Sequence, residues 1–142
     1  MIPDDDLIAS FEELRLPKAE WTHQTHVRVA YLYVRDLPFE TALNKIRTGI
    51  LALNESHGVV NGPDSGYHET VTVAFARLIA AASAQWPNAM STEFCDQNPN
   101  LMEKRVLLNY YSRDVINGRE ARAEFVEPDV NELTVCAPEG MK

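Results

Sequence analysis

Hydrophobic residues recur at intervals of three and four over most of the first 85 residues, which is the spacing of one face of an α-helix. Four segments follow this pattern: residues 4–15, 23–35, 38–57 and 67–85. Proline or glycine stands close to the ends of these segments, at Pro17, Pro38, Gly58 and Pro87. The pattern predicts four helices that form the core of an all-α domain.

The second of these helices has a well-marked start. Thr22 is a suitable N-cap, because its hydroxyl can accept a hydrogen bond from a backbone N–H that the first turn leaves unpaired. Trp21 precedes this cap, where it can pack against the helix as a hydrophobic staple. An apolar stripe follows at Val27, Ala30, Tyr31 and Val34.

The third helix has the clearest hydrophobic stripe in the chain: Phe39, Ala42, Leu43, Ile46, Ile50 and Leu53. The break before it is short, so the second and third helices should lie antiparallel as neighbours. Gly58 is a typical C-terminal stop. Residues 59–66 are rich in glycine, proline and asparagine and are predicted to form a loop.

After the fourth helix the pattern becomes less regular. Residues 101–111 are predicted to be helical, residues 112–117 and 120–125 to form short turns or helices, and the chain from Val126 onward to be extended, with residues 138–142 loose. No alternation of apolar residues is long enough to predict a sheet. The predicted fold is therefore a single domain of 142 residues, with a four-helix core and an irregular helical C-terminal wrap.

Composition limits the classes of function. Thirteen Lys and Arg against 21 Asp and Glu give a net charge of −8, so we expect no nucleic-acid partner. No apolar run reaches the length of a membrane span and the first residues are acidic, so we expect no membrane insertion and, by default, a cytoplasmic location. Cys95 and Cys136 have neither zinc-ribbon nor redox spacing and are expected to be free thiols, although a disulfide between them is possible.

Three of the four histidines lie near the predicted N-terminal ends of two helices. His23 and His26 are one turn apart in the second helix, and His68 lies at the start of the fourth. The two helices can present their first turns at the same end of a bundle if the third runs antiparallel between them. We therefore predict a polar pocket whose three histidines could bind a divalent metal such as Zn, Fe or Ni.

Other residues are candidates for the chemistry of this pocket. Glu69 could be a fourth ligand or a base that moves a proton, although it lies about 100° around the helix from His68. Trp21 and Tyr67 are candidate ligand-binding residues at the pocket. Arg28 could bind an acidic group of a small-molecule ligand through its bidentate guanidinium.

Two other interpretations of the histidines stay open. His26 and His68 could satisfy each other or buried carbonyl groups, because buried polar groups need partners. The protein would then be a non-catalytic helical module that binds a partner or forms a homodimer. Alternatively, the pocket could bind a small molecule without a metal. The chain has no GxSxG, Walker, dinucleotide or HExxH motif that would favour another chemistry.

Three stretches together resemble an uncharacterised family of small bacterial helical proteins. They are W-T-H-x-x-H-x-x-V-A at 21–30, Y-H-E-T-x-T at 67–72 and F-V-E-P-D at 125–129, and the similarity covers about residues 20 to 130. The resemblance implies that these stretches belong to one functional or folding unit, and it implies no particular activity. A looser similarity is to helical bundles of the DinB type, which hold a metal with three histidines at a different spacing.

Overall fold

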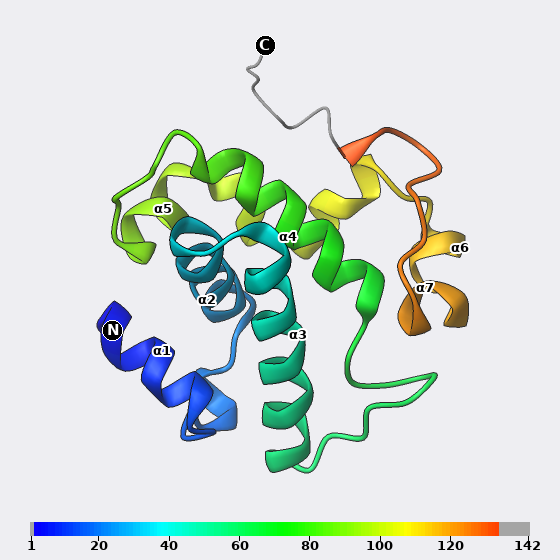
Figure 1. Ribbon diagram of the computed structural model, residues 1–142. Coiled ribbons are helices and arrows are strands. Elements are labelled where there is room, and N and C mark those ends of the chain that lie inside the picture. The colour runs from blue at the N-terminus through cyan, green and yellow to red at the C-terminus, as the bar shows by residue number, and fades with distance from the viewer. Residues whose placement is uncertain (1, 134–142) are drawn as a thin grey trace.

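The computed structural model describes residues 2–133 and shows an all-α fold, as the hydrophobic pattern predicts (Figure 1). The five longest helices are α1 (Asp4–Glu12), α2 (His23–Asp36), α3 (Phe39–Ser56), α4 (Glu69–Ser83) and α5 (Ser91–Gln97). Two short helices and three 3₁₀ segments complete the described chain: α6 (Arg113–Ile116), α7 (Arg119–Ala123), η1 (Lys18–Glu20), η2 (Pro99–Met102) and η3 (Lys104–Asn109).

Helix α2 is the centre of the fold. It packs against α1, α3, α4 and α5, and seven consecutive residues, 27–33, are buried. A helix buried on all sides has to be enclosed by other elements, whereas a surface helix buries one stripe only. The predicted pairing of α2 with α3 through a short connection is present, and α4 packs against both.

The ends of two helices differ from the predicted ends. Helix α1 stops at Glu12, and the chain then adopts a left-handed conformation at Leu14, with φ of 58°. Helix α4 begins at Glu69 rather than at Tyr67, because His68 is its N-cap. Gly58 has a φ of 78°, in the left-handed region that favours glycine, as expected for the residue that ends α3.

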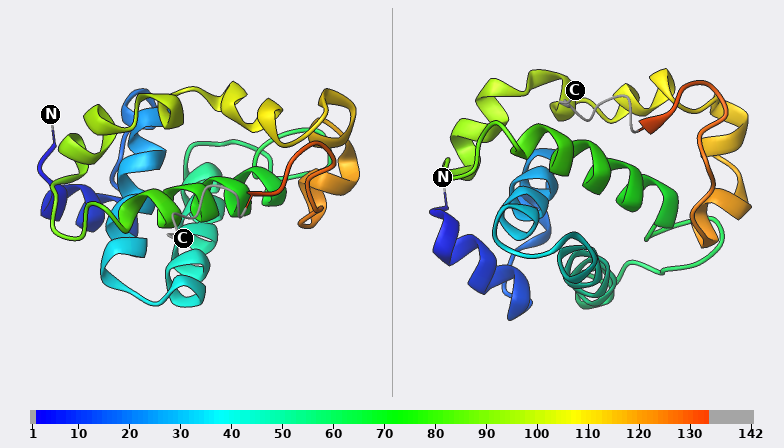
Figure 2. Two further views of the ribbon diagram at one scale, coloured as in Figure 1. Left: turned by 90° about the horizontal axis from the view of Figure 1, so that it is seen from above. Right: turned by 45° about the horizontal axis from the view of Figure 1, so that its top comes forward.

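The C-terminal part wraps around α4. Helix α5 lies at one end of α4, and α6 and α7 lie at the other (Figures 1 and 2). The segment predicted as one helix at 101–111 is instead two 3₁₀ segments that are separated at Glu103, which is extended. Residues of the F-V-E-P-D stretch hold the wrap together, since Tyr111 Oη donates to Val126 O at 2.7 Å and Ser112 N donates to Asp129 Oδ1 at 2.9 Å.

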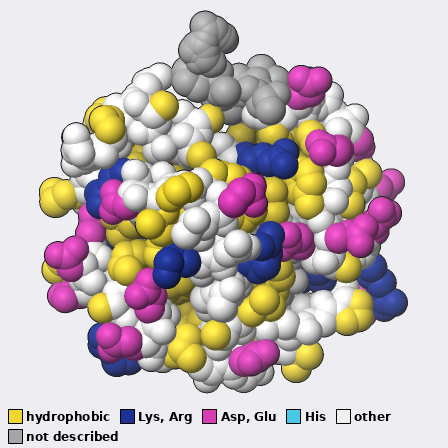
Figure 3. Space-filling view, viewed as in Figure 1, with side chains coloured by type: hydrophobic (Ala, Val, Ile, Leu, Met, Phe, Trp, Pro, Cys, Tyr) yellow, Lys and Arg dark blue, Asp and Glu magenta, His cyan; other side chains and the backbone are white. Residues whose placement is uncertain are grey.

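The surface shows no dominant charged region on the face in Figure 3, where acidic and basic side chains are interspersed with hydrophobic ones. None of the helices in residues 2–133 is both long and apolar enough to cross a membrane. Cys95 is a buried free thiol, and burial raises its pKa to about 11. Cys136 and residues 138–142 lie outside the described residues.

Candidate functional site

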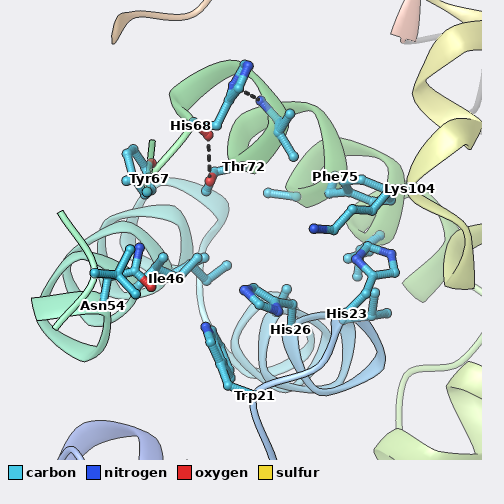
Figure 4. Close-up of a pocket in the computed structure, with 18 residues that line it drawn as sticks. Trp21, His23, His26, Ile46, Asn54, Tyr67, His68, Thr72, Phe75 and Lys104 are labelled. Carbon is cyan, nitrogen blue, oxygen red and sulfur yellow. Dashed lines mark hydrogen bonds between the residues drawn. The ribbon is translucent and has the colours of Figure 1, made fainter. Parts of the chain in front are cut away.

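A cavity of about 260 Å³ lies between the first turns of α2, helix α3, the loop that precedes α4, and the N-terminal half of α4 (Figure 4). Five of the residues singled out in the sequence line it: Trp21, His23, His26, Tyr67 and His68. Most of the remaining wall is apolar: Val27, Ala30, Ile46, Ile50, Val59, Val71, Phe75, Ala76 and Ile79. The histidine-containing starts of α2 and α4 therefore meet at one cavity.

The start of α2 is built as its sequence predicts. Thr22 Oγ1 accepts a hydrogen bond from Thr25 N at 3.3 Å. Trp21 packs against the first turn through His26, with ring centroids 3.8 Å apart, and against Phe11, with centroids 5.4 Å apart. Trp21 thus forms the hydrophobic staple with His26, which lies four residues after the Thr22 cap. This packing holds the His26 ring at the cavity.

His26 is held as a neutral imidazole in one tautomer. Its Nδ1 lies 2.8 Å from Thr22 O, and because a carbonyl oxygen only accepts, Nδ1 carries the proton. Burial lowers the pKa of His26 to about 4, and the positive charge of Lys104 acts in the same direction. The ring extends into the cavity (Figure 4), so its unprotonated Nε2 is a hydrogen-bond acceptor there.

His23 connects α2 with the C-terminal wrap. Its Nε2 donates to Leu101 O at 2.9 Å, and its ring contacts Phe75 edge to face, with centroids 4.9 Å apart. Burial lowers the pKa of His23 and outweighs the opposite effect of the hydrogen bond to Leu101. His23 is therefore neutral at pH 7, with Nδ1 left as its unprotonated nitrogen.

The structure assigns His68 a different role from the predicted one. Its Nδ1 accepts the backbone N–H of Val71 at 3.1 Å, and its Nε2 donates to Ile116 O at 2.8 Å. Both ring nitrogens are therefore used, and the ring points away from the cavity (Figure 4). His68 cannot ligate a metal in this arrangement, and among residues 2–133 no group of three or more His, Cys, Asp or Glu side chains could hold one.

Glu69, the candidate base, does not line the cavity. Its carboxylate accepts two hydrogen bonds from Arg47, at 2.9 and 2.6 Å, and one from Tyr67 Oη at 2.5 Å. Burial raises the pKa of Glu69, but these hydrogen bonds outweigh it and the net shift is downward. A carboxylate that is ionised and paired in this way joins α3 to α4 and is a poor proton acceptor.

Arg28 is also placed away from the cavity. Its side chain is 4% exposed, and it donates from Nε to Ser91 Oγ at 2.7 Å and from Nη2 to Asp4 Oδ1 at 3.2 Å. Ser91 in turn donates to both carboxylate oxygens of Asp4. The cluster fixes α1 and α5 to α2, and Arg28 does not line this cavity.

Three polar residues of the cavity were missed in the sequence: Asn54, Thr72 and Lys104. Thr72 could have been predicted from the sequence, since it lies four residues after His68 on the same face of α4. Lys104 could not, because it begins η3, a segment whose sequence has no helical periodicity. Its amine points into the cavity (Figure 4). Because the histidines are neutral, Lys104 is the only charged side chain among the described lining residues.

Comparison of the chain with protein-family models, with curated proteins and with solved structures found no match. The interpretation of the cavity therefore depends on the geometry of its own residues.

Proposed function

We propose that this protein binds a small organic molecule in the cavity beside His26, and that the histidines supply stacking surface and hydrogen bonds rather than metal ligands. One observation carries the proposal: the starts of α2 and α4 enclose a mainly apolar cavity with a few convergent polar groups. This combination is characteristic of small-molecule sites, and those that hold drug-sized ligands have volumes upward of about 300 Å³. A volume of about 260 Å³ suits a ligand with one ring.

The polar groups of the cavity favour an organic ligand over a metal ion. Of the three histidines at the cavity, only His23 and His26 have an unprotonated nitrogen that accepts no hydrogen bond within the described residues, and a metal centre usually needs further histidine, cysteine or carboxylate ligands. None of the lining residues in the described part of the chain is Asp, Glu or Cys. The ammonium group of Lys104 would in addition repel a divalent cation.

The same geometry favours binding over catalysis. The carboxylate of Glu69 is paired with Arg47, and the Tyr67 hydroxyl donates to Glu69. Neither group is therefore poised to exchange a proton with a ligand in the cavity, since a catalytic base must reach the proton that it abstracts. We infer a binding domain that holds its ligand unchanged.

A cavity-filling variant tests the proposal. The probes are single-ring aromatic and alicyclic compounds with neutral, acidic or basic groups, screened by ligand-observed NMR and confirmed by calorimetry. Thr72→Phe fills the cavity from α4, and Thr48→Phe is the matched control, because Thr48 is an exposed threonine of α3 that does not line this cavity. We expect one-to-one binding to wild type and to Thr48→Phe, and none to Thr72→Phe.

Two results would contradict the proposal. One is a panel without any binder, and the other is binding that persists in a folded Thr72→Phe protein. A titration with Zn²⁺ and Ni²⁺ distinguishes a metal centre from a site for an organic ligand. One-to-one metal binding that is lost in both His23→Ala and His26→Ala, with the helical circular dichroism retained, would instead favour the metal centre predicted from the sequence.

A further inference from the structure

Lys104 introduces one positive charge at a cavity that no Asp or Glu among the described residues lines. It is exposed at the start of η3, and none of residues 2–133 forms an ion pair or a hydrogen bond with its amine. The neighbouring charged residues are paired with each other instead, since Arg105 Nε lies 3.5 Å from Glu103 Oε1. An ammonium group at the edge of an apolar cavity binds an anion more strongly than it would in bulk water.

His26 contributes an acceptor beside this charge. Its proton lies on Nδ1 and is donated to Thr22 O, so Nε2 presents a lone pair to the cavity. The ring packs against Trp21 at an interplanar angle of 35°, and turning it to present the other nitrogen would break the hydrogen bond to Thr22 O. A ligand that fits this atom must therefore bring its own donor, a hydroxyl or an N–H group.

The other hydroxyl groups of the cavity do not change this pattern. Tyr67 Oη donates its proton to Glu69, and Thr72 Oγ1 donates its proton to His68 O at 2.9 Å. Asn54 Nδ2 donates to Asn61 Oδ1 at 3.0 Å. These hydroxyl protons are committed within the protein, so the polar groups left for a ligand are the amine of Lys104, the lone pairs of His26 and His23, and the second N–H and the oxygen of the Asn54 amide. Lys104 is the only one of these groups that carries a charge.

We propose that the ligand is a small organic acid with an apolar ring, whose acidic group pairs with Lys104 and whose hydroxyl or N–H donates to Nε2 of His26. This inference rests on the proposed binding function of the same cavity and adds the chemical class of the ligand. It requires no co-reactant, because binding makes and breaks no covalent bond.

Three series of probes separate the two contacts. The isomeric hydroxybenzoates carry both the acid and the donor, the hydroxybenzamides lack the negative charge, and the methoxybenzoates lack the hydroxyl donor. We expect the tightest isomer among the hydroxybenzoates to bind wild type about tenfold more tightly than its amide, and about fivefold more tightly than its methoxy counterpart. Calorimetry at fixed ionic strength gives the dissociation constants.

Matched variants assign these differences to the protein. Lys104→Met keeps the unbranched apolar part of the side chain and removes its charge. Arg105→Met changes the net charge equally at an exposed residue that does not line the cavity. We expect Lys104→Met to weaken hydroxybenzoate binding about tenfold while Arg105→Met changes it less than about twofold. His26→Phe keeps the stacking ring, and it should remove the preference for hydroxybenzoate over methoxybenzoate.

The outcomes distinguish this inference from the proposed function. If neutral compounds bind the cavity but hydroxybenzoates do not, or if acid and amide bind equally and Lys104→Met affects neither, the inference is wrong and the binding function stands. If no probe of any class binds, both fail. If Arg105→Met weakens hydroxybenzoate binding as much as Lys104→Met does, the affinity depends on the net charge of the protein alone, and the assignment of the contact to Lys104 is wrong.

Discussion

At the scale of single residues, His26 shows how one side chain serves the helix and the cavity together. Its Nδ1–H closes a hydrogen bond within the first turn of α2, to the carbonyl of the Thr22 cap. Its ring stacks on Trp21, and its opposite edge extends into the cavity (Figure 4). The helix start and the candidate binding atom are therefore fixed by the same contacts.

The lowered pKa of His26 predicts an acid-dependent loss of stability. Burial, with Lys104 and His23 acting in the same direction, lowers the pKa from 6.5 to about 4. Between these values the unfolded chain binds a proton that the folded protein does not, so the free energy of unfolding falls as the pH drops. The His26 contribution is absent above pH 6.5 and amounts to about 3 kcal/mol by pH 4.

Denaturant unfolding of wild type and His26→Phe at several pH values measures this contribution. Paired carboxylates such as Asp4 and Glu69, whose pKa values are lowered, also lose stability in acid, but they do so in both proteins. The variant should therefore lose less stability than wild type between pH 6.5 and pH 4. Parallel pH profiles for the two proteins would show that His26 titrates normally in the folded state.

Residue-scale chemistry was predictable from sequence only in part. The spacing of His23 and His26 placed both at one cavity, but it could not show which ring nitrogen each uses for a backbone carbonyl. His68 was expected as a ligand because it lies at the start of the fourth helix near His23 and His26. In the structure it caps α4, a role that the sequence did not indicate because histidine is not a usual N-cap residue. Glu69 was expected as a ligand or base because it adjoins His68, and its pairing with Arg47 was not predicted because Arg47 lies 22 residues away in the chain.

At the scale of elements, the start of α4 is the point at which the C-terminal wrap attaches. Thr70 is fully buried, and its hydroxyl donates to Glu124 O and accepts from Val126 N, both at 3.0 Å. His68 donates to Ile116 O, and Arg122 Nη1 donates to Gly66 O at 2.8 Å. The Y-H-E-T side chains thus connect α4 with the wrap and with α3, which accounts for the motif without a catalytic role.

Two threonine variants in α4 test this attachment. Thr70 is fully buried, so Thr70→Val leaves the Glu124 carbonyl and the Val126 N–H facing an apolar side chain without their partner, and we expect it to lower the free energy of unfolding by about 2–3 kcal/mol. Thr72→Val removes a hydroxyl that donates within its own helix, to His68 O, and should cost less than about 1 kcal/mol. Urea unfolding of both variants gives the comparison. Equal losses would show that Thr70 does not hold the wrap.

The longer elements were predictable because their periodicity is sustained. Helix α3 extends over 18 residues with an apolar stripe, and α2 has both a cap and a stripe. Helix α5 has only seven residues, too few for a stripe to repeat, and it was missed. The segment at 101–111 has enough apolar residues for a helix, but the extended Glu103 divides it into two 3₁₀ segments, both of which contact α4.

At the scale of the whole molecule, one main core joins the N-terminal helices and the wrap. Its buried residues run from Leu7 in α1 to Leu133 near the end of the described chain, and Trp21 and Trp86 pack against it. Trp21 stacks on His26 beside the cavity, whereas Trp86 follows α4, and its carbonyl accepts a hydrogen bond from Tyr31. The two tryptophans therefore report on different parts of the same core.

A shared core predicts that the whole chain unfolds in one step. In the single-tryptophan variants Trp21→Phe and Trp86→Phe, we expect the fluorescence transition to coincide with the far-ultraviolet circular dichroism transition of the same variant. In a one-step transition all probes follow the same equilibrium, so the dependence of the free energy of unfolding on denaturant concentration should also be the same for fluorescence and circular dichroism. The prediction is wrong if, in Trp86→Phe, the fluorescence of Trp21 changes at a lower denaturant concentration than the circular dichroism. The region around Trp21 would then be a separate, less stable unit, and the cavity would form only when that unit is folded.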